Sequence, residues 1–335
     1  MKSVQEIVDL ASAFYGSAVL FAAVEADVFT RIESGDLKGI REGDLPRGLR
    51  LLLDACVAEG LLEKDSSRAY SNTSASRLAL VRGGAADLTK ALKYNADVYP
   101  LWGRLFELVK TNQCVEPPAR HLGEDAARTK AFAEAMYARA TSIGRGVVGM
   151  IDLPRAREGR PMRLLDLAGG PGAFAILLAQ KHPNVTCVTV DLKAISDEAR
   201  KYVEKAGLSD RIECRVGDYH VDEYEKEAYD AVTIFGALHQ ESPHDIVEIL
   251  RRAERALRPG GRVYVLDMMT DATRTAPAFS ALFAVNMALT TTNGWVFSDE
   301  ELKTWMREAN LIPGATEKVP PPMPHWLVTA EKEAR

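Results

Sequence analysis

The chain has few cysteines, and their placement excludes several kinds of site. The four cysteines are Cys56, Cys114, Cys187 and Cys214, and none of them belongs to a CxxC pair. Isolated cysteines are typical of small buried apolar side chains in a reducing compartment. The sequence therefore predicts neither a disulfide framework nor a metal site.

Clusters of basic residues are also missing. Lysine and arginine together number 42 against 47 acidic residues, and the net charge is −5. A protein that binds nucleic acid needs clustered Lys and Arg to neutralise phosphate charges. Nucleic acid is therefore not an expected partner.

A long apolar run is absent from the first turns of the chain, because Glu6 and Asp9 stand inside them. A signal peptide needs an uninterrupted apolar segment, and a membrane span needs about 20 apolar residues. We therefore expect a cytoplasmic protein without a membrane partner.

What the chain does contain is enough apolar material for two cores. Its 335 residues exceed the usual size of one core, and 47% of them are hydrophobic. Residues 151–162 are mostly polar and carry Pro and Gly, as linkers do. We predict an N-terminal domain over residues 1–150 and a C-terminal domain over 163–335.

The pattern of the N-terminal domain is mainly helical. Apolar residues recur at helical spacing from residue 4 to about 34, with a break near Gly16, and further helices are expected at 85–111 and 126–150. A helix over 50–59 precedes two short strand-like stretches around a polar turn, which is the outline of a winged helix. Because that helix has one Arg and no Lys, we predict a dimerisation domain rather than a DNA reader.

The C-terminal domain alternates short apolar runs with helices. The predicted strands are 164–168, 185–191, 212–216, 229–237 and 262–268, and the helices between them are 173–181, 195–206 and 244–257. This alternation predicts an α/β fold, a Rossmann-like doubly wound parallel sheet covered on both faces.

A glycine-rich turn follows the first strand of this domain. Gly169, Gly170 and Gly172 stand between that strand and an apolar helix, where glycine lets the backbone approach a ligand. Asp191 ends the next strand, in a position to accept hydrogen bonds from ribose hydroxyls. The pattern G-x-G-x-x-A, ending at Ala175, equally fits a nicotinamide oxidoreductase.

Later motifs distinguish the two cofactors. GDYH follows the third strand, so that Asp218 can accept from an adenine amino group while Tyr219 covers the ring, and PGG precedes the fifth strand. In this order the motifs of residues 163–335 resemble class I S-adenosylmethionine-dependent methyltransferases.

The resemblance implies a set of cofactor contacts. Asp166 would lie near the methionine end of S-adenosylmethionine and the three glycines beneath it, with Asp191 and Leu192 at the ribose and Asp218 and Tyr219 at the adenine. One position departs from the family, because Ala168 stands where its first glycine usually is.

A histidine follows the fourth strand. His239 occupies the position where plant-type and bacterial natural-product O-methyltransferases, which this stretch resembles, have the base that takes a proton from the acceptor hydroxyl. Asp267 follows it by 28 residues and ends the fifth strand, where the family has the acid that orients the histidine. The family's second acid is replaced by Val296. The resemblance therefore implies a catalytic His–Asp pair and no metal.

The same likeness extends to the N-terminal domain, which resembles the family's dimerisation domain and implies a homodimer. It also places the small-molecule methyl acceptor against two apolar helices. The candidate acceptor contacts are Met136, Tyr137, Phe283, Asn286 and Met287. Core packing is an equal alternative for all of them except Asn286, whose amide needs a partner.

The leading interpretation is O-methylation of an aromatic or polyketide-like metabolite. N-methylation, C-methylation or a non-methylating reaction on the same fold stays open, as does a nicotinamide oxidoreductase. A metabolite-sensing winged-helix regulator would need a basic recognition face.

Overall fold

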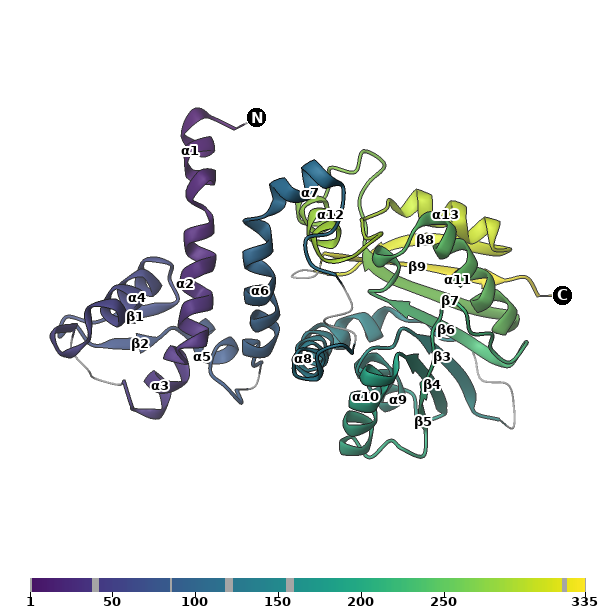
Figure 1. Ribbon diagram of the computed structural model, residues 1–335. Coiled ribbons are helices and arrows are strands. Elements are labelled where there is room, and N and C mark those ends of the chain that lie inside the picture. The colour runs from purple at the N-terminus through teal and green to yellow at the C-terminus, as the bar shows by residue number, and fades with distance from the viewer. Residues whose placement is uncertain are drawn as a thin grey trace. The chain divides into compact units, whose positions relative to one another are not determined.

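The computed structural model describes residues 2–37, 42–84, 86–117, 123–154, 160–320 and 324–334. The chain divides into two compact units, Met1–Tyr99 and Pro100–Arg335 (Figure 1).

The first unit consists of helices and a hairpin. Its helices are α1 (Val4–Ser12), α2 (Phe14–Glu25), α3 (Val28–Ser34), α4 (Arg47–Ala58) and α5 (Ser74–Ala79), with a short 3-10 turn η1 (Glu42–Asp44). Strands β1 (Leu62–Lys64) and β2 (Tyr70–Asn72) pair antiparallel, which confirms the predicted hairpin. The break expected near Gly16 lies instead at Ala13, between α1 and α2.

The N-terminal helices are more apolar than expected. The stretch Val4–Glu25 covers 22 residues and is long and apolar enough to cross a membrane by length and composition. Glu6 and Asp9 therefore interrupt it less than predicted. One such helix is weak evidence for a membrane span, because core helices of soluble proteins and signal sequences have the same length and composition. No residue of α1 is buried.

The second unit is built on a mixed sheet. Within the described residues its strand order is β5-β4-β3-β6-β7-β9-β8. The strands are β3 (Met162–Leu167), β4 (Val185–Asp191), β5 (Ile212–Val216), β6 (Tyr229–Phe235), β7 (Leu257–Met268), β8 (Leu311–Lys318) and β9 (His325–Lys332). The first five run parallel, as predicted. β9 is antiparallel to both β7 and β8, so the sheet is not wholly parallel.

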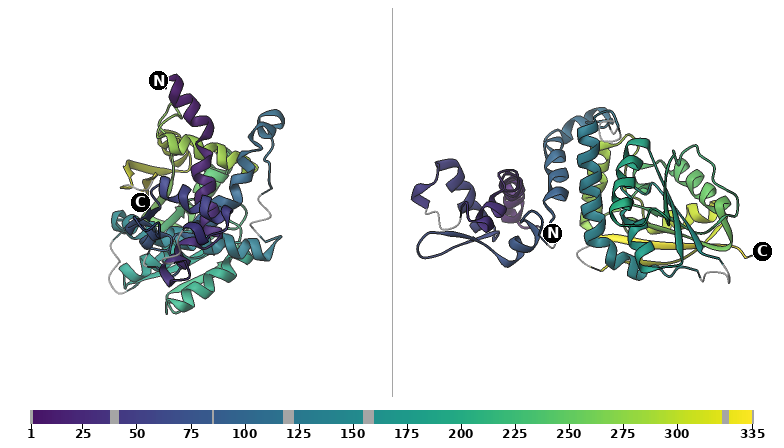
Figure 2. Two further views of the ribbon diagram at one scale, coloured as in Figure 1. Left: turned by 90° about the vertical axis from the view of Figure 1, so that its left-hand side faces the viewer. Right: turned by 90° about the horizontal axis from the view of Figure 1, so that it is seen from below.

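Helices cover both faces of this sheet (Figures 1 and 2). Side chains of α8 (Ala126–Met150) and α9 (Ala173–Lys181) form one apolar cluster with the sheet. Side chains of α11 (Pro243–Ala256) and α13 (Asp299–Glu308) form another. The remaining helices are α6 (Thr89–Trp102), α7 (Leu105–Thr111), α10 (Lys193–Lys205) and α12 (Ala278–Thr290). This is the predicted doubly wound α/β arrangement.

Residues 100–150 group with the sheet and not with the N-terminal unit to which the predicted boundaries assigned them. The reason is visible in α8, which lies so close to α9 that a Cβ at Gly144 would stand 2.5 Å from the Leu177 side chain. The single helix expected over 85–111 is two helices, α6 and α7.

Candidate active site

The glycine-rich turn follows β3 at the carboxyl edge of the sheet. Gly170 and Gly172 have positive φ angles of 57° and 76°, which glycine adopts without strain. A Cβ at Gly169 would stand 1.9 Å from the Thr189 hydroxyl oxygen, so no other residue fits there. Ala168 also has a positive φ of 50°, a conformation that costs a residue with a Cβ about 1–2 kcal/mol.

Asp166 lies directly beneath this turn and is 1% exposed. Its carboxylate accepts hydrogen bonds from Thr233 Oγ1 at 2.7 Å and Thr189 Oγ1 at 3.2 Å. Burial raises the pKa of Asp166 to about 6, against the lowering effect of the two hydroxyls. The threonines were not predicted, because single threonines inside apolar strands carry no sequence signal. Asp166 thus ties β4 and β6 together under the turn.

Asp191 lies at the end of β4, beside the same turn. Its Oδ2 accepts from the Gly170 N–H at 2.8 Å and its Oδ1 from the Leu192 N–H at 2.7 Å. Burial raises the pKa of this carboxyl to about 6, although both N–H groups act in the opposite direction. A carboxylate has about four acceptor positions, so Asp191 keeps capacity for ligand hydroxyls.

Asp218 and Tyr219 belong to a network that the sequence did not reveal. Asp218 Oδ1 accepts from the His220 N–H at 2.9 Å and lies 2.7 Å from His220 Nδ1. Glu241 Oε1 accepts a hydrogen bond from the Tyr219 hydroxyl at 2.7 Å, and Glu241 Oε2 lies 2.8 Å from His220 Nε2. The Tyr219 and His220 rings stack with centroids 4.5 Å apart. The Asp218 side chain stays 43% exposed, open to a ligand.

Electrostatics in this network favour charged side chains. Burial raises the pKa of Asp218, but the hydrogen bonds from His220 outweigh it and leave the pKa below its usual range. Burial lowers the pKa of His220, but Glu241 and Asp218 raise it above its usual range. The His220 imidazole therefore interacts with two carboxylates, and Glu241 connects Tyr219 and His220 to the segment after β6.

His239 and Asp267 meet as predicted. His239 lies in the 3-10 turn η3 (Leu238–Gln240) after β6, and Asp267 near the end of β7. The distance from His239 Nδ1 to Asp267 Oδ1 is 2.6 Å, and the His239 N–H donates to Asp267 Oδ2 at 3.2 Å. The two residues are 8% and 0% exposed. Asp267 thus fixes the orientation of the His239 ring through Nδ1.

The predicted acceptor contacts on α12 differ from one another. The Phe283 ring lies edge-on to His239 with centroids 5.1 Å apart, so Phe283 is part of the site. Asn286 accepts from the Trp102 indole N–H at 3.0 Å, which supplies the partner that its amide needs. Met287 is buried. Trp102 was missed because it precedes Asn286 by 184 residues.

The two candidates on α8 lie in different surroundings. The Tyr137 ring stacks on Tyr202 of α10 with centroids 3.7 Å apart, and it joins the apolar cluster on that face. This is the core-packing alternative for Tyr137. Met136 is half-buried. Val296, at the position of the family's second acid, is buried.

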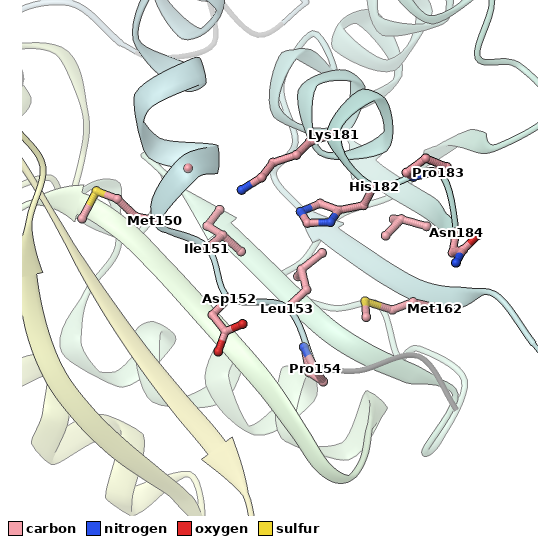
Figure 3. Close-up of a pocket in the computed structure, with 12 residues that line it drawn as sticks. Met150, Ile151, Asp152, Leu153, Pro154, Met162, Lys181, His182, Pro183 and Asn184 are labelled. Carbon is pink, nitrogen blue, oxygen red and sulfur yellow. The ribbon is translucent and has the colours of Figure 1, made fainter. Parts of the chain in front are cut away.

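A cavity of about 470 Å³ lies at the opposite end of β3 and β4 (Figure 3). Its lining includes Met150, Asp152, Lys181 and His182 and none of the predicted site residues. Residues 155–159, which continue from its wall, lie outside the described part of the chain. In the residues that are described, no group of three or more His, Cys, Asp or Glu is arranged to hold a metal ion.

Two family models match the chain. The O-methyltransferase dimerisation domain matches residues 8–82, and the O-methyltransferase domain matches residues 117–311. The second match includes the glycine turn, Asp191, Asp218, His239 and Asp267.

Individual proteins agree with this assignment. The chain is 30% identical to the tetracenomycin polyketide synthesis 8-O-methyl transferase TcmO of Streptomyces glaucescens, over 95% of this chain and 94% of that protein. It is 29% identical to the 3-hydroxy-5-methyl-1-naphthoate 3-O-methyltransferase of Streptomyces sahachiroi, over 97% and 94%. Human N-acetylserotonin methyltransferase, solved in complex with S-adenosylmethionine, shares the fold with a TM-score of 0.85 at 22% identity, covering 99% and 100%. The chain therefore belongs to the O-methyltransferase family, a family of S-adenosylmethionine-dependent enzymes.

Proposed function

We propose that this enzyme transfers the methyl group of S-adenosylmethionine to a hydroxyl group of a small aromatic, polyketide-like metabolite, with His239 as general base and without a metal ion. The observation that carries the proposal is the buried His239–Asp267 pair, which directs one ring nitrogen toward an acceptor. The acceptor class is supported by the two Streptomyces relatives, whose names refer to a hydroxynaphthoate and to a tetracenomycin polyketide.

The residues at the cofactor end fit S-adenosylmethionine. The turn has no room for a side chain at Gly169, so the backbone itself forms the floor. In the proposal Asp166 supports this floor, Asp191 and Leu192 hold the ribose, and Asp218 and Tyr219 hold the adenine. When bound, the cofactor supplies a methyl carbon that its positive sulfur already activates.

His239 supplies the remaining chemistry. Because Asp267 is bonded to Nδ1, the proton on the imidazole stays there and Nε2 carries a lone pair. Nε2 takes the proton of the acceptor hydroxyl as its oxygen gains electron density, and Asp267 stabilises the imidazolium that results. Phe283 against the ring, together with Asn286, Met287 and Met136, orients the acceptor so that much of the rate comes from positioning.

The test is methyl transfer from S-adenosylmethionine labelled in the methyl group to a panel of hydroxynaphthoates and hydroxyanthraquinones. We expect label on an acceptor oxygen and the same rate with and without EDTA. Label on carbon or nitrogen would replace the O-methylation proposal, and loss of activity in EDTA would contradict metal independence.

We also propose that the enzyme is a homodimer formed through the N-terminal helices. The chain carries the family's dimerisation domain, and α1 exposes large apolar side chains that a monomer would leave in water. These side chains are Val4, Ile7, Val8 and Leu10, each at least 56% exposed. Light scattering should give twice the chain mass of 36.7 kDa, and Ile7→Glu should shift it toward the monomer. A monomeric wild type at micromolar concentration would contradict this.

A further inference from the structure

A second histidine lies at the acceptor end of the sheet and has no role in the chemistry above. His325 is the first residue of β9 and pairs with Met268 of β7, one residue beyond Asp267. Neighbouring strands lie about 4.8 Å apart, so His325 occupies the same carboxyl edge as the His239–Asp267 pair. Its side chain is 7% exposed.

One polar atom of this side chain has no partner among the residues that the structure describes. This atom is His325 Nδ1, which is buried. Side chains alternate along a strand, so His325 shares a face with Leu327, whose cluster includes α8. The imidazole thus stands at the edge between α8, which carries Met136, and the strand that carries Asp267.

Burial keeps the His325 side chain neutral. Burial, followed by the positive charge of Arg139 on α8, lowers its pKa to about 4, with smaller effects from Asp267 and His239. A neutral imidazole offers one donor and one acceptor nitrogen. Buried polar atoms without a partner are rare in native proteins and call for a partner.

We propose that His325 binds a second oxygen of the methyl acceptor, a hydroxyl or carboxylate oxygen on the same ring system as the hydroxyl that is methylated. This contact fixes the ring in one orientation and so determines which hydroxyl reaches His239. The inference rests on the proposed function, because it assumes that the acceptor binds against His239.

The test measures binding, so that it does not depend on turnover. Calorimetry in the presence of S-adenosylhomocysteine compares 2-naphthol, which has one oxygen, with 2,3-dihydroxynaphthalene, 1,8-dihydroxynaphthalene and 3-hydroxy-2-naphthoate. We expect the wild type to bind at least one of the three about tenfold or more tightly than 2-naphthol, as one buried hydrogen bond to a charged or polar oxygen provides. His325→Leu should reduce this preference to within twofold, and His325→Gln should recover part of it.

A matched control comes from His182, whose Nε2 is also buried without a partner in the described part of the chain but which lines the cavity at the other end of the strands. His182→Leu should leave the preference unchanged. Thermal unfolding of each variant verifies that it is folded. If the wild type shows no preference, or if His325→Leu retains it, the proposal is wrong.

The two proposals fail separately. His239→Ala should lower the rate of methyl transfer by about 10²–10⁴ but keep the preference for a second oxygen, because His325 remains. If the wild type shows the preference but methylates nothing in the panel, the assignment of the second-oxygen site stands and the proposed reaction does not.

Discussion

The carboxyl edge of the sheet has two halves that are built differently. The half that we propose binds the cofactor, called the cofactor half, lies at the ends of β3, β4 and β5 and is made of backbone groups and carboxylates whose partners lie close by. The half that we propose binds the acceptor, called the acceptor half, lies at β6, β7 and β9 and is made of side chains from distant segments, such as Trp102 with Asn286. In the acceptor half His325 Nδ1 lacks a partner among the described residues, whereas Asp166 and Asp191 in the cofactor half each accept two hydrogen bonds.

This difference separates two tasks. A cofactor common to many enzymes is held by a preformed cradle, and the cradle is complete before the ligand arrives. In the proposal, the acceptor, which differs between relatives, binds to side chains that still have polar atoms without a hydrogen-bond partner in the part of the chain that the structure describes. Variants on the two halves should therefore affect different measurements, binding of the cofactor on one side and turnover or acceptor choice on the other.

The largest expected effect is on the acceptor half. His239→Ala should lower the turnover rate by about 10²–10⁴, because it removes the group that accepts the hydroxyl proton. Affinity for S-adenosylhomocysteine should stay within about twofold, since the cradle is intact. Steady-state kinetics and calorimetry check the two statements. Full activity of this variant on its true acceptor would remove His239 from the mechanism.

Asp267→Asn should lower turnover less than His239→Ala, since the base remains but its proton is no longer held on Nδ1. The double variant should be no slower than His239→Ala alone, because the pair acts as a unit. Additive losses would mean that Asp267 acts on its own.

The next effect belongs to the cofactor half. Asp191→Ala should weaken binding of S-adenosylhomocysteine by about tenfold or more, because each charge-assisted hydrogen bond is worth about 1.5–3 kcal/mol. Turnover at saturating cofactor should change much less. Asp197→Ala, on the exposed side of α10, is the matched control and should bind normally. An unchanged dissociation constant for Asp191→Ala would move the ribose site elsewhere.

A third effect concerns stability and its dependence on pH. The pKa of Asp166 is raised by burial to about 6, above its ordinary value of 3.8. The folded state therefore binds the proton more tightly, and this contribution to stability is present below pH 4 and lost between about pH 4 and 6. Asp166→Asn keeps the neutral amide at every pH. It should exceed the wild type in unfolding free energy by roughly 1–3 kcal/mol at pH 7.5.

Urea unfolding of the two proteins from pH 4 to 8, without cofactor, measures this. The difference should grow up to about pH 6 and then level off. A difference that is constant over this range would show that the charge on Asp166 is not what costs stability.

The smallest effect lies where the two halves meet. His220→Gln removes the ion pairs with Asp218 and Glu241. Asp218 is the partner that we propose contacts the cofactor, and its pair with His220 joins two side chains that are about two-fifths exposed. An exposed pair is worth about 0–1 kcal/mol, so affinity for S-adenosylhomocysteine should fall by no more than about fivefold. Calorimetry at pH 7 decides. A loss beyond tenfold would make His220 a direct cofactor ligand.

The sequence predicted the glycine turn and the parallel strands around it well, because their geometry is local. The turn Gly169–Gly172, the parallel strands and the carboxylates at their ends follow from residue types at short spacing. The last two strands, β8 and β9, were not predicted. β8 forms an edge of the sheet, is largely exposed and lacks an apolar run. Tyr137 shows a further limit, because an aromatic side chain on a helix has the same pattern whether it lines a pocket or stacks on Tyr202.

By itself the sequence determined the doubly wound α/β class, the cofactor turn and the spacing of His239 and Asp267, because strand periodicity and glycine positions restrict the backbone directly. Only the tertiary structure decided that His220 and Glu241 link the two halves, that Trp102 satisfies Asn286 and that His325 reaches the acceptor edge. These contacts join residues that are separated by whole elements. Their positions depend on how strands are ordered and helices packed, which no local pattern encodes.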